Sequence, residues 1–171
     1  MLRETGNFDN VNKLFDSLKK GGAFLVAGRD EVANPMTIGW ATVGIIWGKP
    51  VLTVLVRPSR HTFSLISKHD EFVVCVPEPG MSKELSICGT RSGRDIDKFA
   101  ECGFTKENGL KVSVPHIAQC PMHYECRIVH RNNVSRETLI NGLDSQYYPD
   151  GDFHTVFYGE MLGTYLREKR Y

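Results

Sequence analysis

Short apolar runs, separated by glycine, proline and polar loops, most constrain what this chain can fold into. A doubly wound parallel sheet needs a helix after each strand, and that regular alternation is missing. Short strands with a few helices between them instead predict a mainly β fold, an antiparallel barrel with added helices. We expect strands at residues 23–27, 37–47, 51–56, 72–76, 123–131, 153–158 and 161–166, with a short addition at 138–140.

Helical patterns occupy the segments between these runs, at residues 8–20, 60–69, 81–87 and 95–101. The first has apolar residues on one face and ends at Gly21 and Gly22. Ser59 is the predicted N-cap of the second. With no repeat, linker or low-complexity stretch, the 171 residues predict a single domain at 1–171.

The polar loop after the strand at 51–56 has the chemistry of an anion site. Two guanidinium groups, two hydroxyls and a helix start match the charge and acceptor oxygens of a phosphate. The alternative is that Ser59 only caps the helix and the arginines are solvated. The candidate residues are Arg57, Ser59, Arg60, His61 and Thr62.

A second loop, at residues 88–94, has similar chemistry. Gly89 and Gly93 would let the backbone approach a ligand closely, and Lys98 follows Arg94 by about one helical turn. A cation there would offset charge on a reduced ring. The alternative is a flexible polar loop. The candidates here are Cys88, Gly89, Thr90, Ser92 and Lys98.

The segment at residues 34–40 predicts a surface for an aromatic ring. Thr37 and Gly39 are small and would give a planar ligand access to the main chain beside Trp40. Such a segment near a phosphate clamp indicates a nucleotide-like cofactor, held without a G-x-G-x-x-G or Walker loop. From pattern alone, Trp40 and His154 also fit a structural role. The candidate ring contacts are Met36, Thr37, Ile38, Gly39 and Trp40.

Charge and cysteine content exclude several classes of function. A net charge of +1 provides no extended basic surface for nucleic acid or an anionic membrane. No stretch approaches the roughly 20 apolar residues that span a bilayer. Five cysteines and no export signal indicate reduced thiols in a cytoplasmic protein.

Four residues of types that bind metals lie close together in the sequence, but they do not match a zinc spacing. On an extended strand, Cys120 and Cys126 would point away from His123, so we expect no metal site. Paired catalytic carboxylates and a Ser-His-Asp array are not visible either, and we predict no catalytic residue. The four residues are His116, Cys120, His123 and Cys126.

Three motifs resemble the flavin reductase-like, FMN-binding split-barrel family, with flavoredoxins as the most similar branch. They are residues 34–40, Trp47-Gly48-Lys49-Pro50 and residues 56–62, followed by weaker matches at 92–99 and 154–160. The resemblance extends from about residue 34 to about residue 162, with little recognisable at 132–152. It implies a six-stranded, antiparallel Greek-key split barrel that forms a homodimer with FMN near the interface.

The resemblance also implies roles for the candidate residues. Residues 36–40 would line the isoalloxazine, and the loops at 57–62 and 88–92 would hold the phosphate. Lys98 would lie near the ring, and His154 more loosely so. Cys88 stands where the family often has Ser or Thr.

Two functions in this family, and one outside it, stay open. The first is an oxidoreductase that passes electrons from NAD(P)H, or from a redox protein, through FMN to a flavin or protein acceptor. The second is a non-enzymatic electron-transfer protein with tightly bound FMN. The third is a metal- or haem-binding module on a related barrel.

Overall fold

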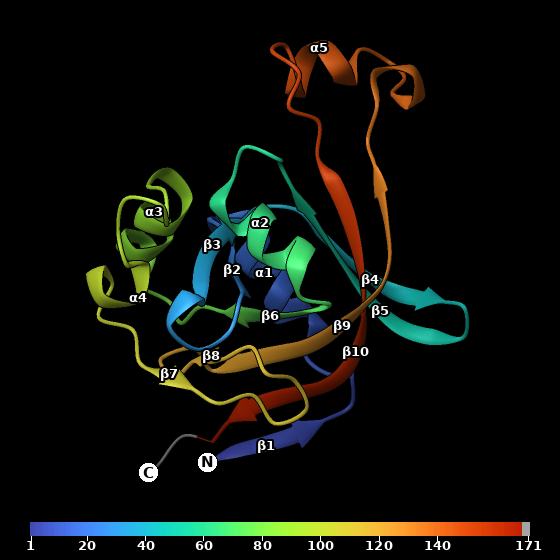
Figure 1. Ribbon diagram of the computed structural model, residues 1–171. Helices are drawn as coiled ribbons and strands as arrows, with labels where there is room; N and C mark the ends of the chain where they lie inside the picture. The colour runs from blue at the N-terminus through green and yellow to red at the C-terminus, as the bar shows by residue number, and fades with distance from the viewer. Residues whose placement is uncertain (169–171) are drawn as a thin grey trace.

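One antiparallel sheet forms the body of the protein in the computed structural model, which describes residues 1–168 (Figure 1). Seven strands follow the order β3-β2-β6-β9-β10-β5-β4, and β1 pairs with β10. This confirms the predicted mainly β split barrel, although eight strands join the sheet rather than six. They are β1 (Leu2–Thr5), β2 (Ala23–Ala27), β3 (Asn34–Ile38), β4 (Ala41–Ile46), β5 (Lys49–Val56), β6 (Glu71–Val76), β9 (Met122–Asn133) and β10 (Thr155–Arg167). A separate pair comprises β7 (Lys106–Glu107) and β8 (His116–Ile117).

The sheet is open between β3 and β4, which follow each other in the chain but lie at its two ends. Only Gly39 and Trp40 join them. The prediction of one strand at 37–47 was therefore wrong, because the chain leaves one edge and enters the other at Gly39. This crossing forms the split of the barrel.

Successive side chains on a strand point to opposite faces of the sheet, and this alternation divides the core into two apolar clusters. Leu25 belongs to the inner cluster, inside the barrel, whereas its neighbours Phe24 and Val26 belong to the outer cluster. On β6, Phe72 and Val74 likewise face inward while Val73 faces outward. β2 is buried on both faces because helices and loops cover the outer side of the sheet.

Helices α1 (Val11–Lys20), α2 (His61–Lys68), α3 (Ser82–Thr90), α4 (Lys98–Glu101) and α5 (Leu143–Tyr147) accompany the sheet, with 3-10 turns η1 (Asp30–Val32) and η2 (Arg136–Thr138). Among the described residues, no helix has both the length and the apolar character to cross a membrane. Ser59 was expected to cap α2, but Arg60 occupies the N-cap and no side chain caps the helix. Helix α3 extends through Thr90, so Cys88 and Gly89 are helical rather than in a loop.

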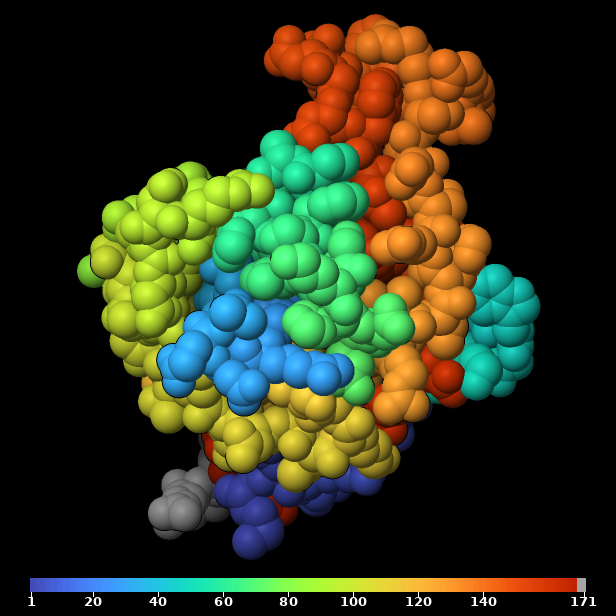
Figure 2. Space-filling model, in the orientation of Figure 1, coloured from blue at the N-terminus to red at the C-terminus, as the bar shows by residue number. Residues whose placement is uncertain are grey.

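The ends of β9 and β10 extend beyond the barrel and carry a projecting arm, residues 134–153 (Figures 1 and 2). The arm contains η2 and α5, and the strand expected at 138–140 is absent from it. The two strands expected at 153–158 and 161–166 are one strand, β10. Gly159 lies within this strand and does not form a turn. A side chain there would lie 2.5 Å from the Phe72 ring, so the glycine is needed for close packing.

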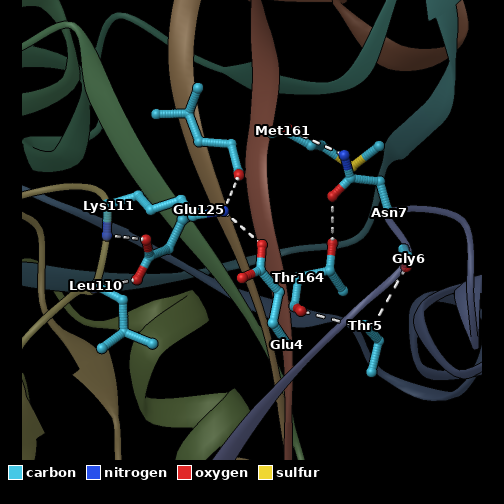
Figure 3. A network of polar contacts seen from close by, with 10 residues as sticks. Glu4, Thr5, Gly6, Asn7, Leu110, Lys111, Glu125, Met161 and Thr164 are labelled. Atoms are coloured by element: carbon cyan, nitrogen blue, oxygen red, sulfur yellow. Dashed lines mark hydrogen bonds and ion pairs between the residues drawn. The ribbon is translucent and has the colours of Figure 1, made fainter.

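The sequence did not predict β1, whose polar residues pair with the distal part of β10. Figure 3 shows the polar contacts that hold this region. Asn7 donates to the Met161 carbonyl at 3.2 Å and accepts from the Thr164 hydroxyl at 3.0 Å. Nearby, the buried Glu125 carboxylate accepts the backbone N–H groups of Leu110 and Lys111, both at 2.6 Å. The loop between β7 and β8, residues 108–115, is thereby fixed to β9.

Candidate functional site

Two adjoining cavities lie at the split of the barrel. The first, of about 320 Å³, is lined by Met36, Thr37, Ile38, Gly39, Trp40, Leu55, Arg57, Arg60 and His154. The second, of about 180 Å³, is lined by Ser59, Arg60, His61, Thr62, Thr90, Arg91, Ser92, Gly93, Arg94 and Lys98. Arg60 lines both cavities. The structure thus brings the three predicted segments, 36–40, 57–62 and 88–98, to one place.

The first cavity has the walls of a slot for a planar group. Its residues come from β3, from the Gly39-Trp40 crossing, from the end of β5 and the loop that follows it, and from His154 just before β10. The Trp40 ring is 43% exposed, and its centroid lies 5.3 Å from those of Tyr147 and His154. Trp40 was predicted as a ring contact, with a structural role as the alternative, and it lines the first cavity.

His154 is neutral at physiological pH. Burial and the positive charge of Arg57 lower the pKa of His154 to about 4. Its Nδ1 lies 2.8 Å from the Tyr148 hydroxyl. His154 lies just before β10 rather than in it. It makes a structural contact, as its pattern indicates, and it also lines the first cavity.

The second cavity is a cationic cleft. Arg60, Arg91, Arg94 and Lys98 line it, and among the described residues its lining includes no acidic side chain. Arg91 pairs with Glu101 at 2.6 Å, outside the cleft, which leaves three cations to face a ligand. Thr62 and Ser92 add hydroxyl groups. Guanidinium, ammonium and hydroxyl donors around a small volume are suited to a phosphate.

Lys98 is buried at the base of this cleft. Its Nζ donates to the Cys88 carbonyl at 2.9 Å, and Arg60 donates to the same oxygen at 3.4 Å. Burial and the charge of Arg60 lower the pKa of Lys98 to about 8. The Cys88 side chain is buried away from the cleft, so its backbone carbonyl is what Cys88 contributes.

Arg57 and Ser59 contact the arm. The Arg57 guanidinium donates to the backbone carbonyls of Tyr147 at 2.8 Å and Asp152 at 3.0 Å. The Asp152 carboxylate accepts the Ser59 N–H at 3.2 Å and the Ser59 hydroxyl at 2.5 Å. The structure therefore places these two candidate phosphate residues against an internal carboxylate and carbonyls.

The predicted site residues did not include Asn34, Arg94 or Asp152. Asn34 is buried, and its Nδ2 donates to Thr62 Oγ1 at 2.9 Å, which orients a hydroxyl in the cleft. Arg94 bonds to the Ser59 carbonyl at 3.0 Å and lines the cleft. Asn34 and Arg94 both stand in motifs that were singled out, so a signal existed for them. None existed for Asp152, which reaches Ser59 from 93 residues away.

The four histidine and cysteine residues at 116–126 do not form one cluster. Cys126 belongs to the inner apolar cluster and Cys120 to the outer one. The rings of His116 and His123 stack with centroids 4.3 Å apart, and His116 bonds to Glu125 at 2.7 Å. Within residues 1–168, no group of three or more His, Cys, Asp or Glu residues could hold a metal ion.

The model of the flavin reductase like domain matches residues 15–171. The chain belongs to that family. This confirms the resemblance drawn from the motifs and extends it to most of the chain. An uncharacterized protein from Archaeoglobus fulgidus is 34% identical over 119 residues, covering 70% of this chain and 67% of the relative. Another from Pyrococcus abyssi is 30% identical over 147 residues, covering 86% and 74%.

Solved structures agree with this assignment. Flavoredoxin from Methanosarcina acetivorans is 28% identical with a TM-score of 0.66, covering 85% of this chain and 68% of that one. An FMN-binding protein from Thermus thermophilus is 22% identical with a TM-score of 0.67, covering 85% and 71%, and shows the shared fold. Membership in the family implies a flavin cofactor.

The residues present fit such a group. A tricyclic ring needs a flat slot with access to backbone groups, and the first cavity has β3 backbone and Trp40 on its walls. A phosphate tail needs cations and hydroxyls, and the second cavity presents Arg60, Lys98 and Thr62. Arg60 lies where the two meet, so one elongated ligand could occupy both.

Proposed function

We propose that this protein is an FMN-binding oxidoreductase that passes electrons from NAD(P)H, through bound FMN, to a flavin or protein acceptor. The observation that carries the proposal is that the cavity lined by residues 36–40 adjoins a cationic cleft at Arg60. Flavin supplies the redox chemistry, while the protein holds the ring and limits access to it. No catalytic acid or base is needed from the chain.

The phosphate of FMN would bind in the second cavity. Arg60, Arg94 and Lys98 supply positive charge, and Thr62, oriented by Asn34, supplies a hydroxyl. Ser92, Thr90 and His61 line the same space. Ser59 would contribute only if Asp152 released it, and Arg57 acts by holding the arm beside the ring.

The ring would bind in the first cavity. Residues 36–40 and Leu55 form its walls, with His154 at one side. His154 stays neutral at physiological pH, so it places no charge beside the ring. Arg60, which lines both cavities, would place positive charge beside the ring, and Lys98 in the adjoining cleft remains largely protonated at pH 7.

The second candidate is a non-enzymatic electron-transfer protein with tightly bound FMN. The 28% identity and shared fold with the Methanosarcina acetivorans flavoredoxin favour it. Both candidates need the same cavities and differ in whether a nicotinamide nucleotide reduces the flavin directly.

Anaerobic rapid mixing of the FMN-loaded protein with NADH and with NADPH separates the two. We expect the flavin absorption band to bleach with at least one nucleotide. If neither nucleotide bleaches it while dithionite does, the protein is the electron-transfer type. If the purified protein neither contains nor takes up FMN, both candidates are wrong, and metal analysis with a visible spectrum then tests the metal or haem alternative.

We also propose that the protein is a homodimer. β4 is an edge strand, and the β4–β5 hairpin exposes Ile45 at 70% and Trp47 at 61%. Apolar side chains of that size on an unpaired edge are typical of an interface. The hairpin begins directly after the Gly39-Trp40 crossing, so an interface there would lie near the first cavity.

A further inference from the structure

Two thiols meet where helices α3 and α4 pack together, behind the cationic cleft. Cys88 lies in the last turn of α3, and Cys102 is the C-cap residue of α4. Their sulfur atoms are 3.8 Å apart, and both are free thiols. Neither the fold nor the proposed flavin chemistry requires a pair of thiols at this position.

The geometry permits a bond between them. A disulfide has an S–S length of about 2.05 Å, so closure needs about 1.8 Å of movement shared by two side chains. Each cysteine stands at or next to the end of its helix, and 14 positions separate them in the chain. Short loops at both helix ends can absorb a small adjustment.

The two thiols differ in accessibility. Cys102 is partly exposed, whereas Cys88 is buried behind it. The outer thiol can therefore meet a reagent from solution, and the inner thiol can then attack the outer sulfur. The other three cysteines are buried, Cys75 in β6, Cys126 in β9 and Cys120 in the segment between β8 and β9.

We propose that Cys88 and Cys102 are a site of reversible disulfide formation by exchange with a low-molecular-weight disulfide. The Cys102 thiolate attacks one sulfur of the small disulfide, whose S–S bond breaks and releases one small thiolate. The Cys88 thiolate then attacks Cys102 Sγ in the mixed disulfide and releases the second small thiolate. Two protein thiols lose two electrons, and their protons pass through solvent to the two small thiols formed.

The bond would join the two walls that hold Lys98. Lys98 begins α4, and the carbonyl that accepts its ammonium belongs to Cys88 in α3. A Cys88–Cys102 disulfide would tie the last turn of α3 to the end of α4 across this contact. The proposal concerns the thiols alone and holds whether or not the protein binds FMN.

The surroundings of the pair set its reaction rate. Burial and the nearby Glu84 and Glu101 carboxylates raise the pKa of Cys102, and the Lys98 ammonium acts in the opposite direction. Burial likewise raises the pKa of Cys88, and Lys98 again opposes the rise. Because the thiolate is the attacking form, exchange should be slow at pH 7 and faster toward pH 9.

The test treats the full-length protein with oxidised glutathione at about pH 8.5, then blocks free thiols and maps peptides by mass spectrometry. We expect a peptide cross-linked between Cys88 and Cys102, three cysteines still blocked as free thiols, and complete reversal by dithiothreitol. A stable glutathione adduct on Cys102 without the cross-link would overturn the proposal. So would a cross-link that joins another pair.

Single-thiol variants test the order of attack. Cys88→Ser should accumulate one glutathione on Cys102, because the resolving thiol is gone. Cys102→Ser should remain unmodified, because Cys88 is buried. Should Cys88→Ser not fold, Cys88→Ala serves in its place. Rapid glutathionylation of Cys88 in Cys102→Ser would contradict the proposed order and with it the site as described.

Discussion

Arg57 and Arg60 belong to one motif, three positions apart, but their guanidinium groups face different parts of the molecule. Both line the first cavity, but the Arg57 guanidinium donates to backbone carbonyls of the arm, whereas Arg60 also lines the second cavity and donates to the Cys88 carbonyl. One arginine therefore positions the arm, and the other is placed for a ligand. The motif alone could not separate these tasks, because the partners of Arg57 lie about 90 residues away.

Replacing Arg60 should weaken FMN binding more than replacing Arg57. A charge-assisted hydrogen bond contributes about 1.5 to 3 kcal/mol, so Arg60→Ala should raise the dissociation constant roughly 10- to 150-fold. Titration of the apoprotein by flavin fluorescence quenching measures it. Arg60→Lys is the matched control and should recover part of the loss. Equal affinity in Arg60→Ala and wild type would remove Arg60 from the phosphate site.

Protonation of His154 should make the folded state less stable in acid. Its folded pKa is about 4, below the ordinary value of 6.5, so the unfolded chain binds the proton more readily. The contribution of neutral His154 to stability is complete above about pH 6.5 and is lost as pH falls toward 4. Chemical unfolding of wild type and His154→Gln at several pH values should show a difference that shrinks by up to about 3 kcal/mol. A constant difference would contradict the lowered pKa.

Among the elements, the arm is held to the barrel by polar contacts together with the Trp40–Tyr147 ring contact. Asp152 accepts two hydrogen bonds from Ser59, and the Arg57 guanidinium lies 4.8 Å from the centre of the buried Tyr148 ring. Arg136 and Asp144 form an ion pair within the arm at 2.8 Å. Polar contacts of this kind open more easily than a packed apolar core.

Removing the Asp152 carboxylate should loosen the arm and leave the barrel intact. In Asp152→Ala, amide hydrogen exchange should accelerate across residues 134–153, because Ser59 loses its partner, while β6 and β9 stay protected. Asp152→Asn retains an acceptor oxygen and should behave close to wild type. Unchanged exchange in the alanine variant would show that the Ser59 contact does not hold the arm.

Strands with alternating or continuous apolar residues could be predicted from the sequence. β2, β5 and β6 lie within a residue or two of the expected ranges, because each buries apolar side chains in the core. The arm and β1 could not be predicted, since their side chains are largely polar and their order comes from distant partners. The break at Gly39 was missed because β-branched residues continue on both sides of it.

Part of the candidate site could also be predicted from the sequence. Each short motif contains its own donors, so residues 36–40, 57–62 and 88–98 could be named separately. Their meeting at one split depends on the order of strands in the sheet. The hydrogen bonds from Ser59 to Asp152 depend on the folded arm, so no local sequence pattern indicates them.

For the whole molecule, the exposed β4–β5 hairpin predicts association. Light scattering should give the mass of a dimer at micromolar concentration. Ile45→Glu should shift the protein toward the monomer, because it places a charge on the proposed interface. Val32→Glu is the matched control, since Val32 is 58% exposed in η1, outside the hairpin, and should leave the dimer intact. A wild-type monomer would contradict the proposal.

The last paired residues of β9 and β10, Asn133 and Thr155, face each other across one ladder step. Adjacent antiparallel chains at such a step stand only about 5 Å apart, close enough for a two-residue turn to connect them. The segment between them, residues 134–154, could thus be exchanged for a minimal reverse turn without altering the strand pairs below. Comparing this shortened protein with the full chain would show what the arm contributes beyond connecting β9 to β10.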